Sequence, residues 1–214
     1  MYSLEGIIIS IAERKERDKA AMREEILNAA RKIVGSSGVD GISIRKIADM
    51  IEYSPASIYH YFKNKEEIVE ILIGENYKKI LETLSLSDFS EITPEEKLKE
   101  GSKRFIQLAV QMGDAYKSVM LSDSETVLSH TSVLQRGAAK ERPAIGMLCD
   151  TLRKLPGYQQ KANNQIEMAA QLIWSLTFGL ALRLIIEQVE EEQQQQLIDN
   201  AAEFIFSAIK NITN

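Results

Sequence analysis

The chain has 214 residues and a formal net charge of −5, from 26 lysines and arginines against 31 aspartates and glutamates. Its single cysteine excludes an internal disulfide framework and a zinc site built from several cysteines, and its two histidines leave little for His-based metal or triad chemistry. Apolar residues make up 44% of the chain, an ordinary share for a folded protein. Taken whole, the acidic balance argues mildly against a nucleic-acid binder.

Targeting and membrane signals are weak in this sequence. The apolar run at residues 7–11 is shorter than the core of a secretory signal, and Glu5 is the only charge before it. The longest apolar stretch, 172–186, is interrupted by Arg183 and is shorter than the roughly 20 residues of a membrane-spanning helix. We therefore expect a cytoplasmic protein of bacterial type that has no membrane partner.

Helical periodicity runs through the first third of the chain. Apolar residues at 22–34 repeat at steps of three and four, which predicts a helix that Gly35 and Gly38 end. A short apolar face covers 44–51. Ser54 followed by Pro55 predicts the N-cap and first turn of a further helix. Asn64, three residues before Glu67, resembles a capping box and begins a long helix that reaches Leu84.

The rest of the chain is predicted to be helical as well. After a loop at 85–92, the sequence Thr93-Pro94-Glu95-Glu96 predicts a capped helix start. Further helices are predicted at about 115–121, around Ile145 to Leu152, at about 162–189, and from Ile198 to Ile212. Residues 122–136 give no clear pattern, and 190–196 fit either a turn or a solvated helix. No long segment alternates with a period of two, so the predicted fold class is all-α.

Charge is unevenly distributed along the chain. Residues 1–65 contain 11 lysines and arginines and 9 acidic residues, a net of +2, whereas residues 66–214 have a net of −7. The acidic part therefore hides a mildly basic N-terminal part. The charged residues within 45–65 are Arg45, Lys46, Lys63 and Lys65, against Asp49 and Glu52.

Two short predicted helices and the turn between them carry the clearest functional signal. Ranges 44–51, 52–54 and 55–62 have the spacing of a helix-turn-helix, whose second helix lies in the DNA major groove with its N-terminal residues at base edges. Pro55 and Ala56 are small enough to let this helix N-terminus approach a phosphate. The polar-tipped residues that can reach phosphates or base edges are Ser57, Tyr59, His60 and Tyr61.

Over about residues 21–72 the sequence resembles the TetR family of bacterial regulators. The resemblance includes stretches 23–30 and 43–48 and is strongest in the block Ile58-Tyr59-His60-Tyr61-Phe62, followed by Asn64-Lys65-Glu66. It implies a capping and phosphate-contacting role for Ser43, a backbone-contacting or base-approaching role for Tyr59 and His60, and a phosphate-binding role for Lys65. The full set of predicted DNA-binding residues is Ser43, Arg45, Ser54, Pro55, Ala56, Ser57, Tyr59, His60, Tyr61 and Lys65.

Two residues of the turn depart from the family pattern. Glu52 stands where the family commonly has glycine, and Tyr53 where it commonly has valine. A left-handed residue other than glycine costs about 1 kcal/mol, so we expect the turn to differ slightly from the family pattern. A carboxylate near DNA also repels phosphate.

The C-terminal part resembles the family variety with a Trp-(small)-x-x-His-Gly signature. Residues 174–180 have that shape, with Phe178 in the histidine place. This resemblance implies an effector cavity and a homodimer formed by the last two long helices as a four-helix bundle. The predicted domains are a 1–20 extension, a 21–66 helix-turn-helix head, and a 67–214 effector-binding and dimerisation domain.

Aromatic and methionine side chains in the C-terminal part fit either of two roles. They pack in an ordinary core, or some of them line a ligand pocket between helices. The pocket candidates are Phe105, Met112, Tyr116, Met120, Met147, Trp174 and Phe178. No metal site, catalytic residue or cofactor is predicted.

A few single residues also have two interpretations. Arg183 within an apolar run needs a partner, either a carboxylate across the dimer interface or an anionic effector. Cys149 on an apolar face fits a small buried hydrophobe better than a reactive thiol. His130 fits an ordinary surface residue. The charged segment 13–19 fits a solvated extension of the first helix or a basic arm that reaches DNA.

We expect a ligand-responsive transcriptional regulator, a repressor, that binds a palindromic operator in double-stranded DNA as a homodimer. An unknown small-molecule effector would act by binding the DNA-incompetent state more tightly. An enzyme is disfavoured, because the sequence has no Glu-x-x-His pair, Cys/His cluster or Gly-rich phosphate loop. The alternative is a helical protein-interaction module without specific DNA binding.

Overall fold

The computed structural model describes residues 11–85 and 92–211. Within these ranges the chain forms eleven α-helices and one short 3₁₀ helix and has no strand, which confirms the all-α prediction. The first ten residues of the predicted extension, most of the predicted 85–92 loop and the end of the last predicted helix at Ile212 lie outside the described residues.

The chain divides into two compact units between Leu72 and Ile73. The described part of the first unit contains α1 (Ile11–Ser37), a 3₁₀ turn (Val39–Gly41), α2 (Ile44–Met50), α3 (Pro55–Ile58) and the beginning of α4 (Lys65–Leu84). Its most deeply buried apolar side chains include Ile26, Ala30, Ile47, Ala48, Ile58, Phe62 and Ile68.

The predicted end of α1 is only partly right. Gly35 continues the helix, whereas Gly38 lies just beyond its last residue with φ 74°. Positive φ is a conformation that glycine adopts without a side-chain clash, so Gly38 rather than Gly35 allows the chain to leave the helix.

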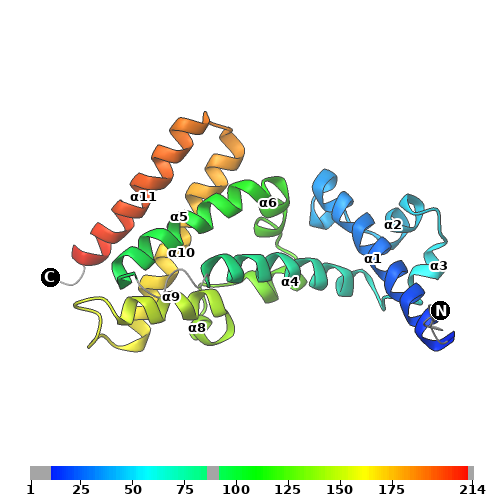
Figure 1. Ribbon diagram of the computed structural model, residues 1–214, viewed down its shortest axis with the longest axis horizontal. Helices are drawn as coiled ribbons and strands as arrows, with labels where there is room; N and C mark the ends of the chain where they lie inside the picture. Colours follow the sequence, from blue (N-terminus) through cyan, green and yellow to red (C-terminus); the bar gives the residue numbers. More distant parts are fainter. Residues whose placement is uncertain (1–10, 86–91, 212–214) are drawn as a thin grey trace, which may run out of the picture. The chain divides into compact units, whose positions relative to one another are not determined.

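The second unit continues α4 and adds seven helices (Figure 1). They are α5 (Pro94–Met112), α6 (Asp114–Met120), α7 (Glu125–Thr131), α8 (Ala138–Glu141), α9 (Pro143–Arg153), α10 (Asn163–Glu187) and α11 (Glu191–Asn211). α5 packs against α9, α10 and α11, and α10 also packs against α9. The core between these helices includes Phe105, Ile106, Ile145, Leu152 and Ile198, each no more than 3% exposed.

Local start signals explain several of these helix boundaries. The Thr93 hydroxyl accepts from the Glu96 N–H at 3.2 Å, and the Glu96 carboxylate accepts from the Thr93 N–H at 2.8 Å, so the predicted capping box is present. The Thr93 N–H and the Thr93 hydroxyl both donate to the Glu96 carboxylate, and these two bonds lower its pKa. Residues 190–196, left open between turn and helix, belong to α11 from Glu191 onward.

α10 is apolar on two sides. One side is buried in the core through residues such as Ile166, Ala170, Ile173 and Ala181. Its other side exposes Met168, Leu172, Leu176 and Ile186, between 49% and 61% exposed. Among the described residues it is the one helix long and apolar enough to cross a bilayer by length and composition, which is weak evidence because the core helix of a globular protein passes the same test.

Arg183 lies within an apolar run, but its side chain is not buried in the single chain. Its side chain is 65% exposed and forms an ion pair with Glu187 one turn further along α10. The apolar run around it supplies both the buried and the exposed side of α10, and Arg183 projects from the exposed one. The carboxylate partner therefore lies on the same helix.

Candidate functional site

The helix-turn-helix predicted from spacing is present as α2, a short turn and α3. Ser43 is the N-cap of α2, and its hydroxyl accepts from the Lys46 N–H at 3.2 Å. Ile47 and Ala48 of α2 are fully buried. The Tyr53 N–H donates to the Ala48 carbonyl at 2.9 Å, which closes the turn onto the end of α2.

Glu52 in this turn adopts the left-handed conformation, with φ 59°. The turn thus keeps the backbone geometry for which a glycine would be suited, although a glutamate occupies the position. The Cβ of Glu52 makes this conformation unfavourable by about 1–2 kcal/mol. The carboxylate is exposed to solvent, so it adds a negative charge beside the recognition segment.

Two serines, Ser54 and Ser57, form the capped start of α3. Ser54 is its N-cap, and its hydroxyl oxygen accepts from the Ser57 N–H at 3.1 Å and lies 2.8 Å from the Ser57 hydroxyl. Pro55 occupies the first turn, where its missing N–H has no consequence. The sequence pattern for this helix start is therefore present in the structure.

The predicted length of this helix, 55–62, is wrong for its α-helical part. α3 ends at Ile58, and the chain continues through tighter i→i+3 bonds, from the His60 N–H to the Ser57 carbonyl and from the Tyr61 N–H to the Ile58 carbonyl. Such bonds satisfy carbonyls that the end of a short helix leaves open. Periodicity alone does not distinguish the two geometries over two turns.

The recognition segment, residues 54–62, has one buried and one exposed side. Ile58 and Phe62 are each 1% exposed and anchor the segment in the core of the first unit. Tyr59 is 56% exposed, and His60 is exposed, whereas Ser57 and Tyr61 are half-buried. The other predicted contact residues that are exposed are Ser54, Pro55, Ala56, Arg45 and Lys65.

Arg23 of α1 holds the end of this segment, a role that the sequence did not single out. Its guanidinium donates to the Tyr61 carbonyl, lies 4.1 Å from the centre of the Phe62 ring, and pairs with Glu67 at 3.5 Å. Glu67 in turn accepts from the Lys63 N–H at 2.7 Å. One half-buried arginine thus fixes the junction between the recognition segment and α4; no spacing signal distinguishes it from other α1 cations.

The other predicted cations have different surroundings. Arg45 on α2 is 86% exposed and lies 3.9 Å from the Asp49 carboxylate, an arrangement that leaves its charge mostly in water. Lys65 is the first residue of α4 and is exposed. Its ammonium therefore sits beside a helix N-terminus, where anions are favoured.

The second unit contains a cavity of about 260 Å³. Of the predicted pocket residues, Phe105, Met147 and Trp174 line it. The other residues of its wall are Leu84, Lys97, Leu98, Gly101, Ser102, Ala144, Leu148, Asp150, Thr151, Lys154, Ile173 and Thr177. The hydroxyl and charged residues among them were missed in the sequence, because isolated polar residues on a helix resemble solvent-facing ones.

The remaining pocket candidates lie in or against the core of this unit instead of in the cavity wall. Met112, Met120 and Phe178 are partly buried against the core, and Tyr116 is 2% exposed within it. The Phe105 ring contacts both Tyr116 and Trp174, with ring centres 6.2 Å and 4.6 Å apart. An aromatic cluster therefore forms the boundary between core and cavity.

The surroundings of Cys149 and His130 agree with the simpler interpretation of each residue. Cys149 is 4% exposed, and burial raises the pKa of its thiol to about 11, as expected of a small buried hydrophobe. His130 is exposed at the end of α7, as expected of a surface residue.

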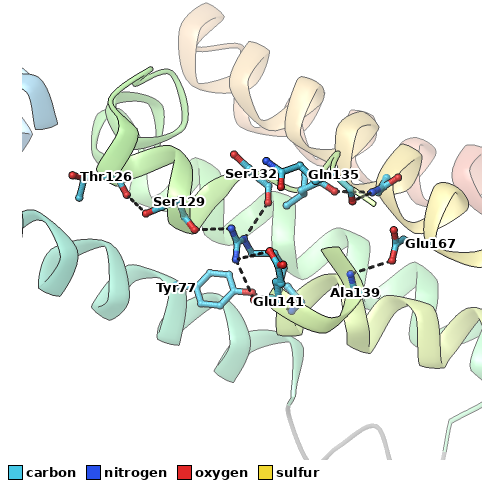
Figure 2. Close-up of polar contacts among 12 residues, drawn as sticks. Tyr77, Thr126, Ser129, Ser132, Gln135, Ala139, Glu141 and Glu167 are labelled. Atoms are coloured by element: carbon cyan, nitrogen blue, oxygen red, sulfur yellow. Dashed lines mark hydrogen bonds and ion pairs between the residues drawn. The ribbon is translucent and has the colours of Figure 1, made fainter. Parts of the chain in front are cut away.

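A polar network joins α4 to the start of α9 and to the segment before it (Figure 2). The Tyr77 hydroxyl of α4 accepts from the Ala144 N–H at 3.2 Å, and burial raises its pKa. Arg142 donates to the carbonyls of Ser132 and Ser129 at 3.0 and 2.6 Å. Since Ala144 also lines the cavity, this network lies directly behind the cavity wall.

The left-handed turn residue gives a testable prediction. We expect Glu52→Gly to raise the free energy of unfolding by about 1 kcal/mol, because glycine adopts positive φ without a Cβ clash. Urea unfolding of the full chain, followed by circular dichroism, measures the change. Glu52→Ala is the matched control: it removes the same carboxylate but keeps the Cβ, so it should gain nothing. An equal gain in both variants would assign the effect to charge and contradict the backbone explanation.

Comparison with known proteins agrees with this geometry. Residues 26–72 match the family model of bacterial regulatory proteins of the tetR family. An uncharacterized HTH-type transcriptional regulator of Haemophilus influenzae is 22% identical over 201 residues, which is 90% of this chain and 97% of that protein. The HTH-type transcriptional repressor AcnR of Corynebacterium efficiens is 27% identical over 90 residues, which is 42% of this chain and 47% of that protein.

A solved structure shares the fold as well. It is a Clostridium perfringens protein described as a putative fatty acid metabolism regulator, with a TM-score of 0.61 and 22% identity over 86% of this chain and 96% of that one. At that identity the likeness shows the fold alone. Residues 26–72, which contain the helix-turn-helix, are therefore similar to the tetR family of bacterial regulatory proteins.

Proposed function

We propose that this protein is a ligand-responsive repressor in the bacterial cytoplasm that binds a palindromic operator as a homodimer, and that it is not an enzyme. The observation that carries the proposal is the recognition segment, whose apolar side is anchored by Ile58 and Phe62 while Tyr59 and His60 are exposed. A polar segment held rigidly by a buried anchor can read base edges with little loss of conformational entropy on binding.

The proposed DNA contacts come from three helix N-termini. Ser43, Ser54 and Lys65 stand at the starts of α2, α3 and α4, where free N–H groups and the helix dipole attract phosphate. Ser57 and His60, further along the recognition segment, are the proposed readers of base edges, and Arg45 adds an exposed positive charge. We propose the head as residues 21–66, within the first compact unit.

The proposed dimer uses the exposed apolar stripe of α10 and α11. Met168, Leu172, Leu176 and Ile186 follow one another at helical spacing along α10, and Phe204 of α11 is 65% exposed. A contiguous apolar patch of this kind is typical of an interaction surface. A second copy presents the same stripe, so an isologous pair covers it and gives the operator its two-fold symmetry.

The proposed effector site is the cavity of the second unit. Its wall contains Leu84 of α4 and also Ala144, whose N–H donates to the hydroxyl of Tyr77 on α4. α4 begins at Lys65, so a ligand that moves α4 acts on an element that starts in the DNA-binding head. A shift of this kind requires the ligand to prefer the DNA-incompetent state. The repressor direction has support from the name of the Corynebacterium relative.

DNA binding is tested by gel shift with the DNA upstream of the protein's own gene, at several salt concentrations. We expect specific binding with a steep salt dependence, because phosphate contacts release counterions. Lys65→Ala should weaken binding to all sequences and reduce the salt slope by about one, whereas Ser57→Ala or His60→Ala should change the sequence preference.

The matched control is Lys140→Ala, which removes an exposed lysine on α8 in the second unit and should leave binding unchanged. If the unaltered chain binds this DNA no more tightly than random DNA, the regulator proposal fails, and the result supports the alternative of a protein-interaction module. If Lys65→Ala and Lys140→Ala behave alike, Lys65 is not a phosphate contact.

The dimer makes a separate prediction. Leu176→Glu places a charge in the exposed stripe of α10, and we expect it to convert the dimer to monomer at micromolar concentration, because an unpaired charge at an apolar interface is costly. Sedimentation velocity measures this. Leu121→Glu, at a side chain that is 58% exposed at the end of α6 and is not part of α10 or α11, is the control and should stay dimeric. A dimeric Leu176→Glu variant would place the interface elsewhere.

A further inference from the structure

The cavity of the second unit has an apolar interior and a charged rim. Leu98, Phe105 and Trp174 are at most 8% exposed and form its deep wall. Asp150 on α9 and Lys154 just after that helix are exposed, and Lys97 on α5 is half-buried, so these three charged residues stand at the solvent side. The rim thus has two ammonium groups and one carboxylate, a net positive charge, in a unit whose sequence has 15 lysines and arginines against 19 acidic residues.

Three buried hydroxyls decide which end of a ligand can enter first. Ser102 donates to the Leu98 carbonyl at 2.8 Å, Thr151 to the Met147 carbonyl at 3.0 Å, and Thr177 to the carbonyls of Ile173 and Trp174 at 3.1 and 2.9 Å. Their protons are committed to their own helices, so they offer only lone pairs to the cavity. A negative group placed among them would be desolvated without a donor. The apolar end of a ligand therefore goes inward.

On these grounds, and resting on the proposed effector site, we propose that the cavity binds a medium-chain organic carboxylate. Its apolar body lies against Phe105 and Trp174, and its carboxylate stays at the rim with Lys97 and Lys154. The cavity volume of about 260 Å³ is just below the roughly 300–1,000 Å³ of pockets for drug-sized ligands, which favours a short, slender body. Asp150 at the rim disfavours dianions.

Calorimetry on the DNA-free full chain tests the ligand class, with three probes of equal chain length: octanoate, octanol and octylamine. We expect octanoate to bind at least tenfold more tightly than octylamine, with octanol between them. The double variant Lys97→Ala/Lys154→Ala should lose at least tenfold in octanoate affinity and keep its octanol affinity, since charge-assisted contacts to the head group are lost. Asp150→Asn should bind octanoate more tightly.

Equal binding of octanoate and octylamine, or an unchanged octanoate affinity in the double variant, would overturn the proposal. So would the absence of heat with any probe on the unaltered chain. Because no DNA is present, these outcomes are independent of the gel shift. A chain that binds octanoate but not DNA refutes the proposed regulator function. A chain that binds DNA but not octanoate refutes the proposed ligand class.

A cavity-filling variant tests the location. Gly101 lies within α5 on the cavity wall, and a Cβ added there would meet only the Leu84 Cδ2 atom at 4.0 Å. Gly101→Leu should therefore fold at least as stably as the unaltered chain, because leucine favours a helix, while its side chain fills the space that octanoate needs. Gly74→Leu, on α4 in open space, is the matched control. Retained octanoate binding by Gly101→Leu would overturn the proposal.

Discussion

The burial of Ile58 and Phe62 is the contact on which the proposed DNA-binding surface depends. α3 has only four α-helical residues, too few to be stable alone, so its orientation comes from these two anchors and from the serine cap at its start. Arg23 completes the arrangement, since its guanidinium holds the Tyr61 carbonyl and the Glu67 carboxylate together. The exposed side chains between the anchors are thereby presented in one fixed register.

In the second unit, α10 has two apolar sides with different roles. One side of this helix supplies the core through Ile166, Ile173 and Leu184, and the opposite side exposes Leu172 and Leu176 to a partner. A helix that is apolar all round is stable only when both sides are covered. The proposed pairing of two copies meets that requirement, and the charges of Arg183 and Glu187 on this side are paired with each other and exposed to solvent.

Sequence reasoning identified the longer helices, several of their caps and the helix-turn-helix, because these depend on local signals such as Ser54-Pro55 and the Thr93–Glu96 box. It did not predict the short helices α7 and α8. It misjudged Arg183, since a run of apolar letters does not show that a helix has two apolar sides. It did not find Arg23, whose role depends on contacts 38 and 44 residues away in the chain. It also missed Thr151 and Lys154, because a cavity between helices is created by tertiary packing and leaves no periodic signal.

Hydroxyl-radical footprinting of the full chain on DNA selected from a random pool tests the central claim most directly. The account predicts protection of two patches related by a two-fold axis, about one helical turn or a multiple of it apart, because two copies present the same recognition segment. A single unsymmetrical patch would contradict the paired arrangement. The absence of any sequence enriched over the random pool would contradict the claim that residues 54–62 read DNA.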